Sequence, residues 1–211
     1  MNPESLCDFL ELIKTRRSVR RFRCEKIDSE LIKTVMEAVK FSPTPTNRQC
    51  FQFLAVSDPL LLKSMRQEIL VKIDEISKNL SEEAATAFRE YSQWFTFFDQ
   101  APVVLFGLYR IFVSRFPSGK DSGKSLEGMA EIQAFGGAVN SLLLALHAQG
   151  LAGCWMSGPL IAEEGIERIL RIESPWRLGA VIPVGLPESI PPVPKKPTLD
   201  AVFSWFPPHD F

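Results

Sequence analysis

The sequence predicts an α+β fold, in which about four strands form a central sheet and helices flank it. Apolar residues recur at helical spacing in several segments, and four short apolar runs have the length of strands. The two kinds of segment do not alternate regularly, as they would in a doubly wound sheet. The 211 residues, 45% of them hydrophobic, suffice for a substantial core, and no linker or internal repeat divides them. We therefore expect residues 1–211 to form a single domain.

The N-terminal quarter predicts two helices and a strand. Pro3 to Lys14 places apolar residues on one helical face, and Asp28 is a candidate N-cap for a second helix running to about Phe41. That helix must end near residues 42–45, because Pro43 and Pro45 disfavour helix at and before their own positions. The short apolar run from Phe51 to Val56 then predicts a strand.

Residues 60–98 have a helical pattern and predict two helices broken near residues 79–81, where Ser81 can cap the second. The segment ends in an aromatic cluster that comprises Trp94, Phe95, Phe97 and Phe98. Two interpretations stay open. The rings form a helix face packed on the core, or the segment is a helical flap or insertion whose rings close over a planar ligand.

The central part of the chain predicts the remaining strands around the longest helix. Pro102 to Tyr109 is the second strand, and residues 126–149 form a helix whose second half is apolar almost all round. Such a helix is buried, either centrally or at a subunit interface. Ala152 to Met156 and Trp176 to Leu186 predict the third and fourth strands, with a short helix from Ala162 to Ile172 between them.

The C-terminal segment predicts an extended arm with an apolar end. Residues 191–197 are proline-rich and include Lys195 and Lys196, and the tail that follows contains Leu199, Val202, Phe203, Trp205 and Phe206. So apolar a tail should be covered, either by the body of the chain or by a second subunit.

Composition excludes several classes of function. The formal net charge of −1 gives no overall field for nucleic acid, and no apolar run reaches the length of a membrane span. Met1 to Leu10 contains Glu4 and Asp8 and no basic region, so we expect no signal peptide. Four scattered cysteines without a CxxC pair, and only two histidines, argue against a metal site and for reduced thiols in the cytoplasm.

Gly123-Lys124-Ser125 falls between a predicted strand and a predicted helix, as a phosphate-binding P-loop does. A P-loop needs glycine at the position of Ser118, and Gly119 is one residue out of register. No GxGxxG occurs either. We interpret residues 116–125 as a solvated polar loop.

The most concentrated charge in the chain lies at the end of the first helix. Arg16, Arg17, Arg20 and Arg21 surround Ser18 and Val19, and Phe22 closes the cluster. Guanidinium groups bind phosphate oxygens in bidentate fashion, so this cluster suits one phosphate group better than a length of nucleic acid. The alternative is a solvated helix end whose arginines pair with nearby acids.

Taken together, four motifs resemble the FMN-dependent nitroreductase family. Residues 16–22 are similar to the opening motif of that family and Ser42 to Gln49 to its proline-serine-asparagine-glutamine motif. Gly136 to Gly153, leading into Cys154-Trp155, is similar to the third motif. Residues 184–187, followed by Lys195-Lys196-Pro197 and the apolar tail, look like the closing segment. The resemblance spans residues 10–206 in the right order.

The resemblance implies a three-layer fold with a mostly antiparallel sheet, a homodimer that exchanges its C-terminal arm, and bound FMN. By resemblance, Arg16 and Ser18 hold the FMN phosphate, with Arg17 and Arg20 nearby and Lys195 or Lys196 reaching it from the arm. Pro43, Thr44 and Asn47 contact the flavin ring, usually from the other subunit, and the backbone of Met156, Ser157 and Gly158 donates a hydrogen bond to the flavin. Gln133 is a further candidate.

The sequence departs from the family pattern at three places. Thr44 replaces the usual serine and keeps a hydroxyl, Cys50-Phe51 replaces a common proline-tryptophan pair, and residues 60–98 match no particular subgroup. We find no catalytic triad or carboxylate pair, as expected if the flavin carries the chemistry.

The implied activity is hydride transfer from NADH or NADPH through FMN to an electron-poor acceptor, such as a nitroaromatic compound or quinone, by a ping-pong mechanism. Reductive dehalogenation, flavin breakdown and a non-catalytic flavin-binding module stay open as alternatives.

Overall fold

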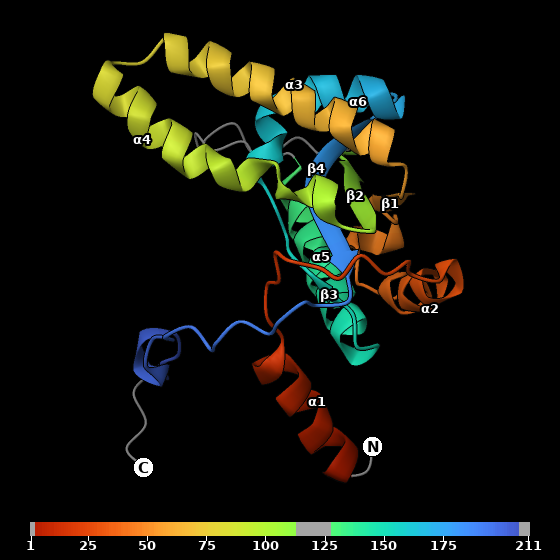
Figure 1. The fold of residues 1–211 in the computed structure, drawn as a ribbon. Helices are drawn as coiled ribbons and strands as arrows, with labels where there is room; N and C mark the ends of the chain where they lie inside the picture. The colour runs from red at the N-terminus through yellow and green to blue at the C-terminus, as the bar shows by residue number, and fades with distance from the viewer. Residues whose placement is uncertain (1–2, 113–127, 207–211) are drawn as a thin grey trace, which may run out of the picture.

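The computed structural model describes residues 3–112 and 128–206 (Figure 1). Its strands and α-helices confirm the predicted order, and their bounds follow. The helices are α1 (Pro3–Thr15), α2 (Ser29–Val39), α3 (Pro59–Lys78), α4 (Glu82–Ser92), α5 (Met129–Ala148) and α6 (Glu163–Leu170). The strands are β1 (Phe51–Val56), β2 (Val103–Arg110), β3 (Ala152–Gly153) and β4 (Trp176–Gly185). The predicted loop at residues 116–125 lies outside the described residues.

The strands form one sheet in the order β1-β2-β4-β3, and every neighbouring pair is antiparallel. This confirms the α+β fold with a mostly antiparallel sheet. One parallel bridge joins Ser18 to Gly153 of β3, and it continues the sheet beyond that strand. The basic cluster therefore lies at the β3 edge of the sheet.

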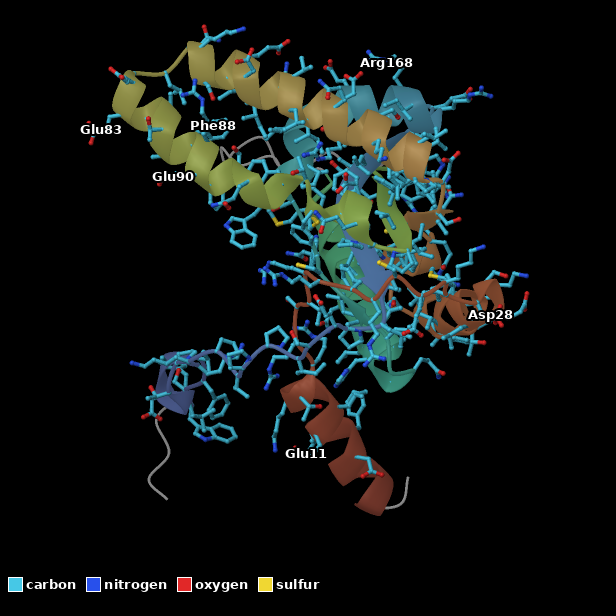
Figure 2. All side chains as sticks on the ribbon, viewed as in Figure 1. Glu11, Asp28, Glu83, Phe88, Glu90 and Arg168 are labelled. Carbon is cyan, nitrogen blue, oxygen red and sulfur yellow. The ribbon has the colours of Figure 1, made fainter. Side chains whose placement is uncertain are left out.

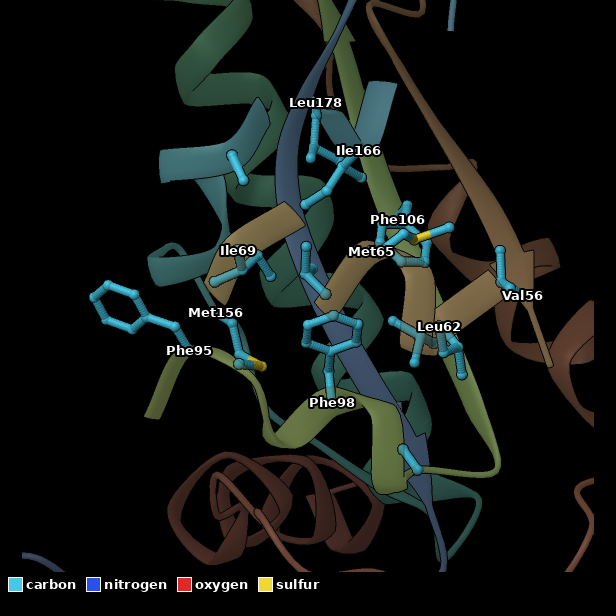
Figure 3. Packing of buried hydrophobic residues seen from close by; sticks show 14 of the residues in the cluster. Val56, Leu62, Met65, Ile69, Phe95, Phe98, Phe106, Met156, Ile166 and Leu178 are labelled. Carbon is cyan, nitrogen blue, oxygen red and sulfur yellow. The ribbon is translucent and has the colours of Figure 1, made fainter. Parts of the chain in front are cut away.

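Helices cover both faces of the sheet, which gives three layers. In β2, Val104, Phe106 and Leu108 face a core made with α3 and α6, whereas Val103 and Leu105 face a second core made with α2 and α5. The alternation follows from the two-residue period of a strand. Figure 3 shows the first core, where Leu62, Met65 and Ile69 of α3 lie close to Phe98, Phe106 and Ile166.

Local sequence signals place the helix ends where they were predicted. The Asp28 side chain accepts a hydrogen bond from the Glu30 amide at 2.9 Å, and Asp58 does the same for Leu60 at 2.8 Å. Ser81 caps α4 through the Ala84 amide at 3.4 Å. Each N-cap satisfies an amide that the first helical turn leaves unpaired.

The third strand is shorter than predicted. Regular pairing covers only Ala152 and Gly153, and Met156 then makes an isolated bridge to Val181. The hydrophobic pattern alone could not distinguish a continuous strand from a short strand followed by an isolated bridge, because both place apolar side chains in the core.

Helix α5 lies against the sheet, and its second half is buried as predicted. Leu142, Leu143 and Leu146 pack in the second core, whereas Met129 and Ile132 of the first half are exposed. By length and composition α5 alone among the described helices could cross a membrane. Its contacts with α2 and the sheet identify it as a core helix.

Two segments project from the body of the protomer. Figure 1 shows α1 and the C-terminal arm leaving the three layers in different directions. Phe9, Leu10 and Ile13 of α1 are exposed, and so are Phe203 and Trp205 of the arm. The chain's own body thus leaves the apolar tail uncovered.

Candidate functional site

The segment after α1 places the arginines at two neighbouring cavities. The Val19 amide donates to the Gly153 carbonyl oxygen at 3.2 Å, and the Val19 side chain is buried. Arg16 and Arg17 line one cavity with Gly153, while Arg20 lines another with Cys154. The two cavities therefore flank consecutive residues of the chain, Gly153 and Cys154.

The first cavity, called here the Arg16 cavity, has a volume of about 180 Å³. Its lining contains no acidic residue and consists of Thr15, Arg16, Arg17, Val19, Leu143, His147, Gly150, Leu151, Ala152, Gly153, Pro187 and Ile190. Arg16 Nη1 and Arg17 Nε are buried and have no hydrogen-bond partner among the residues that the structure describes. Buried charged donors without partners are costly, so this arrangement favours an anion that would accept from them.

Arg17 is held by the chain itself. Its Nη1 donates to the carbonyl oxygens of Lys14 at 2.7 Å and Arg16 at 2.8 Å. Both carbonyls belong to the end of α1, where helical carbonyl groups otherwise lack partners. The alternative in which the arginines pair with nearby acids fails for Arg16 and Arg17, because neither forms an ion pair in the described part of the chain.

The second cavity, called here the aromatic cavity, has a volume of about 370 Å³. It is lined by Arg20, Tyr91, Trp94, Phe95, Phe97, Cys154, Trp155, Met156, Ser157 and Gly158. Arg20 is the charged member of that set, and its guanidinium carbon lies 5.9 Å from the centroid of the Trp94 ring. A cavity lined by aromatic rings and one cation suits a planar ligand that carries negative charge.

Phe95 ties the α3–α4 hairpin to the loop that follows β3. The ring is buried, and a methyl group added at Gly158 would lie 2.2 Å from its Cδ1 atom. Tyr91 and Phe88 of α4 pack edge-on against Phe95, at centroid distances of 5.3 and 6.5 Å. In Figure 2, Phe88 points inward from α4 while Glu83 and Glu90 point outward. The rings thus position both the hairpin and residues 156–158.

The loop at residues 156–158 has fewer free donors than the sequence predicts. The Met156 amide donates to the Val181 carbonyl oxygen at 3.0 Å and is therefore used by the sheet. Among the described residues, the amides of Ser157 and Gly158 have no such partner. Both residues line the aromatic cavity, so their amides are the candidate donors of the loop.

Cys154 lines the aromatic cavity beside this loop. Burial raises the pKa of its thiol, an effect that the charge of Arg20 only partly offsets. The thiol is consequently neutral near pH 7, in agreement with a packing role. No cluster of metal-ligating side chains occurs in residues 3–112 and 128–206.

The remaining predicted residues lie elsewhere on the protomer. Pro43 and Asn47 are exposed, and the side chains of Thr44 and Asn47 accept hydrogen bonds from Gln49 at 3.1 and 2.7 Å. This loop contacts the first half of α5, where Gln133 is exposed. None of these residues lines either cavity.

Ser18, Lys195 and Lys196 also lie outside the linings of both cavities. Ser18 is partly buried at the bridge to Gly153, and the two lysines are exposed on the arm. One protomer therefore brings together Arg16 and Arg17 at one cavity, and Arg20 and residues 156–158 at the other, but not the rest of the predicted set.

His147 is a cavity-lining residue to which the motif resemblance assigns no role. It lies in the last turn of α5 and lines the Arg16 cavity. Its position three residues before the helix-ending Gly150 was the available signal, because the last turn of a core helix often reaches the surface.

Comparisons with known proteins agree with the fold described above. A relative from Thermotoga neapolitana, an iodotyrosine deiodinase, is 27% identical over 91% of this chain and 94% of its own length. The crystal structure of a BluB-like flavoprotein from Clostridium difficile 630 has a TM-score of 0.82, with 24% identity over 93% of this chain and 97% of that one. An iodotyrosine deiodinase bound to FMN and 3-iodo-L-tyrosine has a TM-score of 0.71, with 24% identity over 90% of this chain and 96% of that one.

The fold of these structures is the three-layer fold described above. The family model named Nitroreductase family matches residues 13–186, which include the basic cluster, the sheet, the lining of the aromatic cavity and most of the lining of the Arg16 cavity. On this evidence the chain belongs to the nitroreductase family.

Proposed function

We propose that this protein is an FMN-dependent oxidoreductase that passes hydride from NADH or NADPH to an electron-poor acceptor, such as a nitroaromatic compound or quinone. The observation that carries the proposal is the Arg16 cavity, where two buried guanidinium nitrogens lack partners and no acid competes for them. That cavity adjoins one lined by aromatic rings, as a phosphate-bearing planar cofactor requires.

The residues present fit FMN. Arg16 and Arg17 would hold its phosphate from the Arg16 cavity, with Ser18 at the adjoining bridge. Arg20 lines the neighbouring aromatic cavity, so it would meet the ring system rather than the phosphate. The amides of Ser157 and Gly158 would donate to the ring.

Bound FMN would supply the hydride-transfer chemistry, and the protein supplies position, charge and exclusion of water. Arg20 would stabilise negative charge that develops on the ring during reduction, because its guanidinium group stays protonated. The rings of Trp94 and Phe95 would keep water from the reacting face. A donor and an acceptor that use the same face in turn predict ping-pong kinetics.

We propose that the hairpin of residues 60–98 acts as a flap that forms one wall of the acceptor site. Tyr91 and Trp94 are 66% and 53% exposed at the aromatic cavity, while Phe95 anchors the hairpin beneath them. Both interpretations of the aromatic cluster thus apply to different rings: Phe95 and Phe98 pack in the core, and Trp94 faces the cavity.

We propose that two copies of the chain complete each site in a homodimer. Pro43, Thr44, Asn47 and Gln133 lie away from both cavities, so they would contact FMN bound by the other subunit. Lys195 and Lys196 would reach the phosphate from the arm. The exposed apolar residues of α1 and the arm supply a surface that a second copy would cover.

The exchanged arm has a candidate seat. A cavity of about 650 Å³, with largely apolar walls, lies between the start of α2, the end of β1 and the start of β2. It adjoins β1, which has no second neighbour within the described sheet. An open strand edge beside an apolar cavity suits an extended apolar segment such as the arm.

Reconstitution tests the proposal. Purified protein titrated with FMN should bind it with quenching of flavin fluorescence, and NADH or NADPH should then bleach the visible absorbance of the oxidised flavin. Oxygen-free addition of a nitroaromatic compound or quinone should restore that absorbance. Protein that does not bind FMN refutes the proposal, and protein reduced without acceptor-dependent turnover is a flavin-binding module instead.

We also propose a cytoplasmic location, which the free cysteines, Cys24 among them, would fit.

Reductive dehalogenation is the second candidate, because the Thermotoga neapolitana relative is an iodotyrosine deiodinase that aligns over 91% of this chain. Incubation of the reduced, FMN-loaded protein with 3-iodo-L-tyrosine, with release of iodide as the readout, separates this reaction from nitro or quinone reduction. Product analysis with reduced FMN under oxygen tests flavin breakdown, the activity suggested by likeness to a BluB-like fold.

A further inference from the structure

The hydrogen bonds around His147 define its neutral form. Thr15 Oγ1 donates to the Glu11 carbonyl oxygen at 2.6 Å, so its single hydrogen is used there. The contact between Thr15 Oγ1 and His147 Nε2, at 3.1 Å, then requires the ring nitrogen to donate. Neutral His147 is thus assigned the tautomer with hydrogen on Nε2, and Nδ1 is the position that takes up a proton.

The charges that face His147 are predominantly positive. From the end of α1 and the segment after it come Arg16 and Arg17, which line the same cavity. Lys14 and Glu11 of α1 pair with each other at 2.8 Å, and their charges largely cancel. Neither α5 nor the segments around Gly153 and Pro187 place an acidic side chain in the cavity lining.

This environment keeps the ring neutral in the free protein. Burial lowers the pKa of His147, and the charges of Arg16 and Arg17 lower it further. A phosphate group in the same cavity would reverse the second effect, because it brings a charge of about −1.5 to −2 close to the ring.

We propose that His147 is a third cationic member of the phosphate site, neutral in the free protein and protonated when a phosphate monoester lies beside Arg16 and Arg17. The inference rests on the proposed function, since it assigns the Arg16 cavity to the phosphate of FMN. It goes further by giving one residue of α5 a role that the motif resemblance does not assign.

Protonation on binding has a measurable consequence. FMN binding takes up a fraction of a proton between the low pKa of His147 in the free protein and its higher pKa in the complex. The affinity for FMN therefore rises as pH falls through this window, by up to about tenfold per pH unit. Riboflavin, which lacks the phosphate, should bind without proton uptake at His147.

The test is calorimetric titration of the full-length protein with FMN at pH 6.5, in two buffers with different heats of ionisation. We expect roughly half a proton taken up per FMN in the wild type. For His147→Gln, which keeps a donor toward Thr15, we expect a clearly smaller uptake. Because the phosphate itself titrates near pH 6, the difference between the two proteins is the quantity that counts. Equal uptake in wild type and variant overturns the proposal.

A second measurement does not depend on a variant. The chain contains two histidines, so the ring signals of His147 and His209 can be followed by NMR as pH changes. We expect the His147 titration to move to higher pH when FMN is added and to stay in place with riboflavin. An unchanged titration with FMN bound overturns the inference about His147 but leaves FMN binding intact. Failure to bind FMN at all is a different result, and it refutes the proposed function.

Discussion

Arg16 and Arg17 present donors that the fold itself does not use. Arg16 Nη1 is buried beside the cavity and makes no hydrogen bond, although the neighbouring Arg17 is held by two carbonyl groups. A fold that leaves such a donor in place carries an energetic cost that an anion would remove.

Replacing Arg16 with alanine should therefore weaken FMN binding without unfolding the protein. A hydrogen bond to a charged group contributes about 1.5–3 kcal/mol, so we expect the Kd to rise roughly ten- to a hundredfold. Fluorescence titration of the apoprotein measures the change, and thermal unfolding of the apoprotein should be nearly unaltered. Arg23→Ala removes the same charge from an exposed pair with Glu25 and serves as the matched control. Equal losses in both variants would point to net charge alone.

Gly158 is the second residue whose role follows from its surroundings. A methyl group there would lie 2.2 Å from Phe95 Cδ1, inside the contact distance of carbon atoms. Gly158→Ala should destabilise the protein by about 1–3 kcal/mol, as overpacking of a buried site does. Phe95→Leu in the same chain should recover part of that loss, because the smaller side chain gives the methyl group room. Urea denaturation of the two single variants and the double variant measures the coupling, and strictly additive losses would contradict the contact.

Single-residue roles were predicted from the sequence only where a motif carried them. The motif resemblance singled out Arg16, and the structure places it in the lining of the Arg16 cavity. The same motif placed Arg20 near the phosphate, whereas the fold carries its side chain to the aromatic cavity. His147 lies 131 residues along the chain from Arg16, yet both residues line the Arg16 cavity. That arrangement depends on how the end of α1 packs against the last turn of α5, and no local sequence pattern encodes such packing.

Among the elements, the helices were predicted most closely because their ends carry chemical signals. Asp28, Asp58 and Ser81 cap helices, and Pro43 and Pro45 keep the chain after α2 from continuing it. The third strand was predicted too long because residues 154–156 keep apolar side chains in the core without regular pairing. The exposure of Pro43 and Asn47 agrees with the motif resemblance, which assigns the contacts of that loop to the other subunit.

The α3–α4 hairpin is the element expected to decide which acceptors are used. Trp94→Ala removes a ring from the wall of the aromatic cavity and leaves Phe95, the buried anchor, in place. We expect the KM for aromatic acceptors to rise roughly fivefold to thirtyfold, in line with about 1–2 kcal/mol for lost ring stacking. FMN affinity should stay near the wild-type value.

Steady-state kinetics with a nitroaromatic compound and with a small non-aromatic acceptor provide the comparison for Trp94→Ala. The loss should be confined to the aromatic acceptor. Tyr91→Phe, which keeps the ring and its edge-on packing against Phe95, is the control within the same hairpin. A uniform loss with both acceptors would mean that Trp94 supports the flavin site and not the acceptor.

At the scale of the whole molecule, the predicted site residues fall into two separate groups on one protomer. Arg16, Arg20 and residues 156–158 lie at the two cavities, while residues 43–47 and Gln133 lie near the start of α5. The motif resemblance implies both parts and assigns the contacts of Pro43, Thr44 and Asn47 to the other subunit, but it does not give where these residues lie relative to the cavities of their own protomer. The separation is what makes a dimer the natural unit of function in our proposal.

Disruption of the C-terminal arm tests the proposed dimer directly. Phe203 and Trp205 are 49% and 52% exposed, and their rings pack edge-on with a centroid distance of 5.3 Å. The body of the protomer therefore leaves these two apolar side chains partly accessible to water. Burial of such rings in a partner would contribute roughly 25 cal/mol for each Å² removed from water. The double variant Phe203→Ser/Trp205→Ser should therefore shift the protein from dimer to monomer, measured by light scattering after size-exclusion chromatography. Since part of each proposed flavin site comes from the partner, FMN affinity should fall with the loss of the dimer.

Leu80→Ser is the control for the arm variant. It changes an exposed apolar residue at the tip of the hairpin and should leave the dimer intact. A wild-type protein that is monomeric when it binds FMN would contradict the shared site, and a double variant that stays dimeric would place the interface on α1 and α5 without the arm.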